Sequence, residues 1–193
     1  MTAADLIAFE IEVVRAFEAG AIRGPVHMSG GNEKQLIDLF GKIRREDWVF
    51  ATYRNHYHAL LHGVPAARVM AEILASRSMN LSFPEYRFVT SAIVGGCLPI
   101  AVGVAAALRR KGSERRVWCF VGDMAASIGA FHEAHAYAEG HGLPITFVKE
   151  DNGLSCDSPT RECWGGDRSS LKAISYRYTR VYPHVGIGKY VSF

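Results

Sequence analysis

The chain has 193 residues, of which 49% are hydrophobic and 21% are charged. This composition is ordinary for a globular protein, and the length is enough for one domain with a substantial core. The formal net charge is only +3 and the basic residues are dispersed, so we expect no nucleic-acid partner. No run of 18 apolar residues occurs, and the first residues lack the features of a signal peptide. We therefore expect no membrane association and a cytoplasmic location.

Hydrophobic periodicity and turn residues predict alternating helices and strands along the chain. Residues 3–19 are predicted to form an amphipathic helix, because Leu6, Phe9, Val13 and Phe17 fall at helical spacing. Further helices are predicted at about 32–43, 65–76, 97–110 and 126–140, and strands at 47–52, 117–121 and 145–149. Residues 77–92 are predicted to be a loop, because they lack a clear period and contain Pro84. The turn-rich tail contains one candidate strand at 174–182.

This order of elements predicts an α/β fold in which a parallel sheet carries helices on both faces. No internal repeat, linker or low-complexity segment interrupts it. We therefore expect a single domain over residues 1–193, with an N-terminal helix within 1–20 and a short C-terminal extension at 157–193.

The segment from Gly122 to Asn152 is the part of the chain that points most directly to a function. Gly122-Asp123-Met124 follows one apolar run, Asp151-Asn152 ends another, and one helix length separates them. A strand–helix–strand crossover of this kind brings both strand ends to the same edge of a parallel sheet, where open α/β sheets bind ligands. Two hard oxygen donors at that edge suit a magnesium-type cation that also holds a diphosphate.

The crossover resembles the diphosphate-binding motif of thiamine diphosphate (ThDP) enzymes, which begins Gly-Asp-Gly and ends Asn-Asn. Taken alone, the same pairs are equally typical of ordinary strand-end turns. Further segments at 30–33, 47–56, 62–64 and 93–99 resemble, in the same order, the alpha subunit of the ThDP-dependent 2-oxo-acid dehydrogenases. The resemblance covers about residues 20–155, and several motifs in order are more specific than any one of them. It implies the ThDP-binding version of the α/β fold.

The resemblance implies how the strand ends bind this cofactor. The side chains of Asp123 and Asn152 and the backbone carbonyl of Leu154 would bind magnesium. The residues assigned to the diphosphate are Gly122, Met124, Ala125 and Asn152. Met124 stands where the family has glycine, which is tolerated if the backbone there is right-handed but is strained if φ is positive.

Two other pairs are assigned to the cofactor by the same resemblance. Tyr53 and Arg54 would reach its diphosphate side, although a surface arginine paired with a carboxylate is the alternative explanation of Arg54. Gly95 and Leu98 match the segment that holds the aminopyrimidine ring, and a tight turn before a helix explains Gly95 equally well.

Two histidines are assigned catalytic roles. His56 matches the family histidine near the cofactor and would contact an oxo or carboxylate group of the substrate. His184 would stand in for the histidine-containing loop that the longer family members carry near their active sites.

The resemblance also implies a reaction and its partners. ThDP and Mg²⁺ would be the cofactors for decarboxylation of a small 2-oxo acid, with the acyl or aldehyde unit then passed on, for example to a lipoyl domain. In this family the activating glutamate comes from a beta-type, pyrimidine-binding subunit, so the chain would supply half of an active site in a two-alpha two-beta heterotetramer. The alternatives are a subunit of a split transketolase-like carboligase and a non-catalytic remnant of the fold.

Overall fold

The computed structural model describes residues 1–166 and 173–191 of the chain. They divide into two compact units. Unit 1 comprises Met1–Arg45, Tyr53–Thr90 and Thr179–Phe193, and unit 2 comprises Glu46–Thr52 and Ser91–Tyr178. The single domain expected from the sequence stays a prediction.

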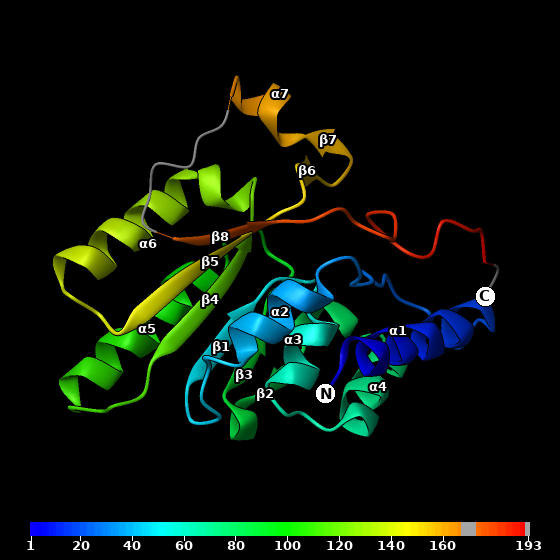
Figure 1. Cartoon of the computed structure of the whole chain (residues 1–193), viewed down its shortest axis with the longest axis horizontal. Helices are drawn as coiled ribbons and strands as arrows, with labels where there is room; N and C mark the ends of the chain where they lie inside the picture. Colours follow the sequence, from blue (N-terminus) through cyan, green and yellow to red (C-terminus); the bar gives the residue numbers. More distant parts are fainter. Residues whose placement is uncertain (167–172, 192–193) are drawn as a thin grey trace. The chain divides into compact units, whose positions relative to one another are not determined.

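Unit 2 is built on parallel strands in the order β1, β4, β5, β8. These strands are β1 (Trp48–Ala51), β4 (Val117–Gly122), β5 (Ile145–Asp151) and β8 (Ile174–Arg177). Residues 117–121 of β4 are all buried, as is typical of a central parallel strand that is covered on both faces. Helix α5 (Cys97–Arg110) packs against β1, β4 and β5, and also against helix α6 (Gly129–Gly140) (Figure 1).

Short elements surround the carboxyl ends of these strands in unit 2. The 3₁₀ turn η3 (Ala125–Ser127) precedes α6, and a small hairpin of β6 (Leu154–Ser155) and β7 (Ser158–Pro159) follows β5. Helix α7 (Thr160–Trp164) continues from β7, and the three elements project together beyond the end of β5 (Figure 1). The candidate metal and diphosphate residues of unit 2 lie in and around these connections, and Gly95 and Leu98 lie at the start of α5.

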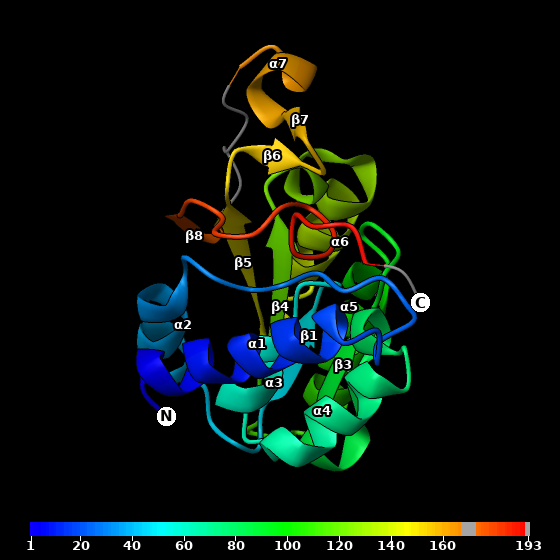
Figure 2. The same ribbon diagram turned by 90° about the vertical axis from the view of Figure 1, so that its right-hand side faces the viewer.

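Unit 1 is mainly helical. Helix α1 (Ala3–Glu18) begins with a capping box, in which Thr2 and Asp5 each accept a hydrogen bond from the other's backbone N–H. Helices α2 (Glu33–Phe40) and α4 (Ala66–Leu74) contact α1, and α3 (His56–Leu61) contacts both of them (Figure 2). The segment after α4 contains η1 (Ser78–Asn80), β2 (Ser82–Phe83), η2 (Pro84–Tyr86) and β3 (Phe88–Thr90).

The structure confirms the predicted α/β class, with mainly parallel strands flanked by helices, and corrects several of its elements. The predicted loop at 77–92 is wrong, because β2 and β3 pair there as an antiparallel hairpin. Helix α3 was not expected, because its first residues are polar. The helix predicted from 126 begins instead at Gly129, since Ile128 is extended and separates it from η3. The candidate strand at 174–182 ends at Arg177.

Candidate functional site

The crossover in unit 2 has the predicted parallel geometry. Strands β4 and β5 are adjacent and parallel, with Gly122 opposite Glu150. Asp123 follows the last paired residue of β4, and Asp151 ends β5 one residue before Asn152. The residues predicted to bind metal therefore follow the carboxyl ends of neighbouring strands, where ligands bind in open parallel sheets.

Asp123 is buried although its carboxylate is incompletely paired. The residue is 5% exposed, and its Oδ2 atom has no hydrogen-bond partner among the described residues. Burial raises the pKa of Asp123; the Thr160 hydroxyl opposes this rise, and the Asp151 carboxylate adds to it. A buried, unpaired carboxylate oxygen costs free energy, and a bound cation would remove that cost.

The turn after β5 fixes the other predicted donors. Asn152 Oδ1 accepts the Leu154 N–H at 2.9 Å, and its Nδ2 donates to the Tyr178 hydroxyl at 3.2 Å. Gly153 has φ +72 and donates its N–H to Asp151 Oδ1 at 3.1 Å. Within residues 1–166 and 173–191, no group of three His, Cys, Asp or Glu side chains could hold a metal. A cation at Asp123 would therefore draw its other ligands from amide and backbone oxygens.

Met124 adopts a right-handed backbone, with φ −65 and ψ −44. The departure from glycine is therefore accommodated without strain. The Trp164 indole N–H donates to the Met124 sulfur and holds that side chain. Ala125 begins η3 rather than α6, so the backbone groups predicted to face phosphate lie in a 3₁₀ turn.

Gly95 lies in a tight turn before α5. Its φ is +74, a backbone conformation that requires glycine. A Cβ atom there would come within 2.7 Å of Ile128 Cδ1, the end of a side chain that would have to move aside. Leu98 is fully buried in the first turn of α5. This geometry accounts for the sequence of the turn, and a role in holding an aminopyrimidine ring stays a prediction.

Unit 1 brings Tyr53, Arg54 and His184 together. The ring centroids of Tyr53 and His184 are 5.7 Å apart, and the Arg54 guanidinium donates to the backbone carbonyls of Met28 and, at 3.3 Å, of His184. His27 completes this cluster, with ring centroids 4.4 Å from Tyr53 and 4.9 Å from His184. The cluster thus joins two distant parts of the sequence within unit 1.

His56 is fully buried in unit 1. Its Nδ1 lies 3.0 Å from Glu10 Oε1 and its Nε2 lies 2.8 Å from Ser78 Oγ, so both ring nitrogens are engaged. Glu10 Oε1 also accepts the Ser29 N–H at 2.9 Å. The structure thus places His56 in a buried hydrogen-bonded network, and its catalytic role stays a prediction.

Sequence reasoning missed Glu10, Ser78 and His27. Glu10 had a detectable signal, since it is a carboxylate beside Phe9 on the buried face of an amphipathic helix. Ser78 and His27 had none, because both lie in segments without a recognisable period. Burial, followed by the charges of Arg54 and the neighbouring histidines, lowers the pKa of His27 to about 3.

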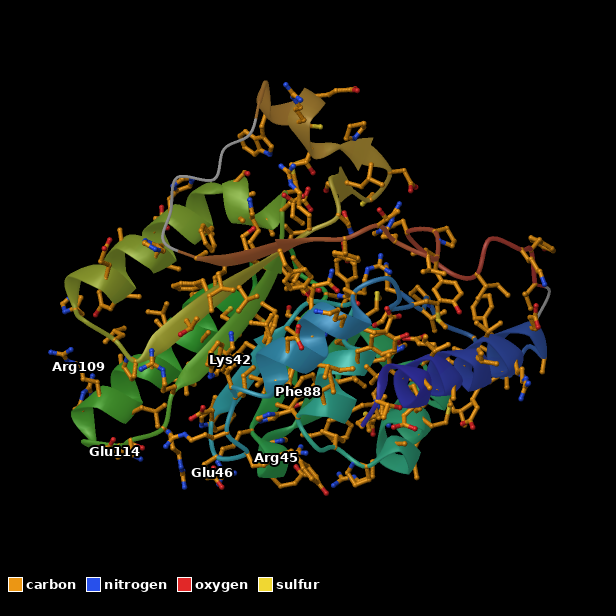
Figure 3. All side chains as sticks on the ribbon, viewed as in Figure 1. Lys42, Arg45, Glu46, Phe88, Arg109 and Glu114 are labelled. Carbon is orange, nitrogen blue, oxygen red and sulfur yellow. The ribbon has the colours of Figure 1, made fainter. Side chains whose placement is uncertain are left out.

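The basic residues near 109–116 lie away from the candidate residues of unit 2. Arg109 and Glu114 lie around the end of α5, before β4 begins, whereas Asp123 follows the other end of β4 (Figure 3). Arg109 donates to the Gly142 carbonyl at 2.6 Å.

Among the described residues, no helix has the length and apolar character needed to cross a bilayer.

Comparison with known proteins identifies relatives over most of the chain. The family model of the dehydrogenase E1 component matches residues 1–178. The alpha subunit of acetoin:2,6-dichlorophenolindophenol oxidoreductase from Bacillus subtilis (strain 168) is 29% identical over 178 residues, which are 87% of this chain and 54% of that protein. The pyruvate dehydrogenase E1 component subunit alpha of Porphyra purpurea is 31% identical over 161 residues, or 75% of this chain and 47% of that protein.

A chloroplastic relative gives the same result. The pyruvate dehydrogenase E1 component subunit alpha-3 of Oryza sativa subsp. japonica is 31% identical over 186 residues, covering 86% of this chain and 41% of its own. A solved structure of a proposed thiamin diphosphate-dependent enzyme from Mycobacterium smegmatis has a TM-score of 0.47 at 22% identity, covering 67% of this chain and 22% of its own. The chain spans about half the length of the curated relatives it matches.

Proposed function

Because the chain belongs to the family of dehydrogenase E1 components, we propose that it is an alpha-type subunit that binds ThDP and Mg²⁺ and takes part in decarboxylating a 2-oxo acid. The names of the relatives support the 2-oxo acid chemistry, since two of them are pyruvate dehydrogenase E1 alpha subunits. As the chain spans about half of those proteins, the complete reaction and its partners belong to the proposal.

The incompletely paired Asp123 carboxylate, just after β4, is the observation that carries this function. It lies at the ligand-binding edge of a parallel sheet, and it is buried without a partner for Oδ2 among the described residues. The other ligands that the resemblance implies are the Asn152 amide and the Leu154 carbonyl, which are oxygen ligands of the kind that Mg²⁺ prefers. The donor set therefore fits the cation that the family resemblance implies.

The remaining assignments follow the resemblance. Gly122, Met124 and Ala125 are proposed to face the diphosphate with their backbone, and Gly95 and Leu98 to hold the aminopyrimidine ring. When bound, ThDP supplies the electron sink for cleavage of the carbon–carbon bond beside the oxo group.

The residues proposed from unit 1 are Tyr53 and Arg54 for phosphate and His56 and His184 for catalysis. The Arg54 guanidinium is planar and permanently charged, and its paired N–H donors match the geometry of phosphate oxygens. Half-buried His184 is the better placed of the two histidines to meet a substrate, because His56 is enclosed by Glu10 and Ser78.

A beta-type partner is part of the proposal, because this chain is not assigned the glutamate that activates ThDP. Ile93 and Val94, which precede Gly95, are largely exposed. These two side chains do not form a large apolar patch by themselves, and we propose that they belong to the surface that the partner covers. We further propose a two-alpha two-beta assembly. A lipoyl domain would accept the acyl unit.

Asp123→Ala tests the metal assignment, with Asp157→Ala at an exposed position as the matched control. Thermal unfolding of the chain, purified with any stoichiometric partner, is measured without ligand, with ThDP, and with ThDP plus Mg²⁺. We expect ThDP to raise the Tm of the wild type and of the control only when Mg²⁺ is present. Asp123→Ala should lose this response and be about 1–3 kcal/mol more stable without ligand, since a buried carboxylate with one unpaired oxygen is removed. An intact Mg²⁺-dependent response in Asp123→Ala would show that the metal assignment is wrong.

A further inference from the structure

Strand β5 carries an ammonium and a carboxylate two positions apart, at Lys149 and Asp151. Alternate residues of a strand face the same side of the sheet, and Lys149 Nζ lies 3.8 Å from Asp151 Oδ2. Each of the two side chains is only 11% exposed. The two charges therefore form a largely buried pair.

The contacts of Asp151 identify Lys149 as its buried counter-charge. Asp151 Oδ1 accepts the Gly153 N–H, and Oδ2 also accepts a hydrogen bond from Arg177 Nε at 3.3 Å. The Arg177 side chain is 73% exposed, so water screens its charge. Lys149 is shielded from water, and an ammonium in such a position is costly unless an anion compensates it.

This pair lies beside the proposed cation ligand. Val121 pairs with Lys149 and Gly122 pairs with Glu150, so Asp123 directly follows the paired end of β4, beside the part of β5 that carries the charge pair. Asp151 is also the residue before Asn152, the second proposed ligand. The ammonium and the carboxylate therefore lie at the strand ends that the proposed ligands follow.

We propose that Lys149 and Asp151 form a compensating charge pair. This pair sets the relative affinities of the site at Asp123 for a cation and for a diphosphate. Asp151 strengthens the binding of a cation, and Lys149 strengthens the binding of a diphosphate. The inference rests on the proposed function, because it takes Asp123 as the cation ligand. In the motif that the chain resembles, asparagine stands at the position of Asp151, so here a carboxylate replaces a neutral amide and Lys149 offsets its charge.

Two single variants of the full chain test this pair. Asp151→Asn removes the negative charge, and Lys149→Met removes the positive charge at similar side-chain length. Binding of Mn²⁺ alone is measured by electron paramagnetic resonance, and binding of inorganic diphosphate alone by calorimetry, at one pH and one ionic strength. Asp151→Asn should weaken Mn²⁺ binding and tighten diphosphate binding, each by about tenfold, and Lys149→Met should do the reverse. Shifts of both variants in the same direction overturn the proposal.

The double variant Lys149→Met/Asp151→Asn provides the decisive comparison. It leaves neither charge of the pair buried without the other, so it should fold even if a single variant does not. We expect it to return both affinities to within about threefold of the wild type, as two compensating charges require. Affinities that remain about tenfold from wild type overturn the proposal. Arg177→Gln is the control, because it removes a charge that also contacts the Asp151 carboxylate but is screened by water. It should change each affinity by less than about twofold.

Asp123→Ala, measured in the same assays, separates this inference from the proposed function. If Asp123→Ala retains the Mn²⁺ affinity of the wild type, the proposed cation site is wrong, and the charge pair loses its basis. If Asp123→Ala loses Mn²⁺ while Asp151→Asn and Lys149→Met leave both affinities unchanged, the cation site stands and the charge pair alone is overturned.

Discussion

Two buried carboxylates illustrate how differently the same chemical group is used in this chain. Glu10 in unit 1 accepts hydrogen bonds through Oε1 from the Ser29 N–H and contacts His56 Nδ1. Glu10 Oε2 and, in unit 2, Asp123 Oδ2 both have no hydrogen-bond partner among the described residues. The two carboxylates differ in their surroundings: Glu10 contacts an imidazole in a buried network, whereas Asp123 follows the carboxyl end of a parallel strand, where open sheets bind ligands.

His56→Ala should therefore act mainly on stability. The substitution leaves the Glu10 carboxylate and the Ser78 hydroxyl buried without the imidazole that contacts both of them. We expect a loss of about 3–5 kcal/mol in the free energy of unfolding, measured by urea denaturation. The control is His132→Ala at an exposed position, which should stay within about 0.5 kcal/mol of wild type. A loss below about 1 kcal/mol for His56→Ala would contradict the structural role.

His27 should make stability depend on pH in the acidic range. Its pKa is lowered from 6.5 to about 3, first by burial and then by Arg54, His184 and His56. Below pH 6.5 the unfolded chain takes up a proton that the folded state excludes. The free energy of unfolding therefore falls as the pH falls towards 3, by up to about 1.4 kcal/mol per pH unit.

His27→Gln removes this titration, so its stability should fall less steeply than that of wild type between pH 6.5 and 4. Urea midpoints across this range measure the two slopes. The control is His141→Gln, which replaces an exposed histidine and should keep the wild-type slope. Equal slopes for wild type and His27→Gln would show that His27 is not held neutral in the folded state.

At the residue level, local patterns nominate the candidate ligands Asp123 and Asn152 but give no sign of the buried network around His56 in unit 1. Asp123 comes just after the apolar run 117–121, Asn152 follows the run 145–148 after three charged residues, and one crossover separates them. The contact between His56 and Glu10 joins residues 46 positions apart, and no local pattern encodes such a contact. The backbone conformation of Met124 is an intermediate case. The sequence shows that a residue other than glycine occupies the position, but only the structure gives the sign of φ.

At the scale of elements, prediction succeeds where a hydrophobic period is long enough to be detected. Helix α5 matches its predicted range of 97–110 at both ends, and β4 extends only one residue beyond 121. The hairpin of β2 and β3 was missed because its strands have two and three residues, which are too short to display alternation. Helix α3 was missed because His56 and His58 are buried polar residues, which a hydrophobicity pattern counts as exposed.

The turn before α5 provides a test of element geometry. Gly95→Ala should destabilise the protein by about 1–3 kcal/mol, chiefly because alanine is strained at φ +74, and its Cβ would also push the end of the Ile128 side chain aside. Gly103→Ala, within α5, should stabilise it by about 0.5–1 kcal/mol, since a Cβ there meets nothing within 4 Å and alanine favours a helix. Thermal or urea unfolding measures both changes. Changes of the same sign would contradict the assigned geometry of the turn.

At the scale of the whole molecule, the connectivity of the two units bears on whether the chain is a single domain. The chain passes from one unit to the other after residues 45, 52, 90 and 178, so neither unit is a continuous segment. Domains usually meet at few chain crossings, and a unit assembled from interrupted segments has little means of folding alone. We therefore expect the two units to unfold in one cooperative transition.

The tryptophans allow this expectation to be tested, because Trp48, Trp118 and Trp164 all belong to unit 2. Their fluorescence reports the unfolding of unit 2, whereas His56→Ala weakens the network in unit 1. In a single cooperative domain, His56→Ala should lower the urea midpoint seen by fluorescence as much as the midpoint seen by far-ultraviolet circular dichroism. Gly103→Ala, in unit 2, should raise both midpoints together. A fluorescence midpoint that stays at the wild-type value in His56→Ala, while circular dichroism shows an earlier transition, would mean that the units unfold independently.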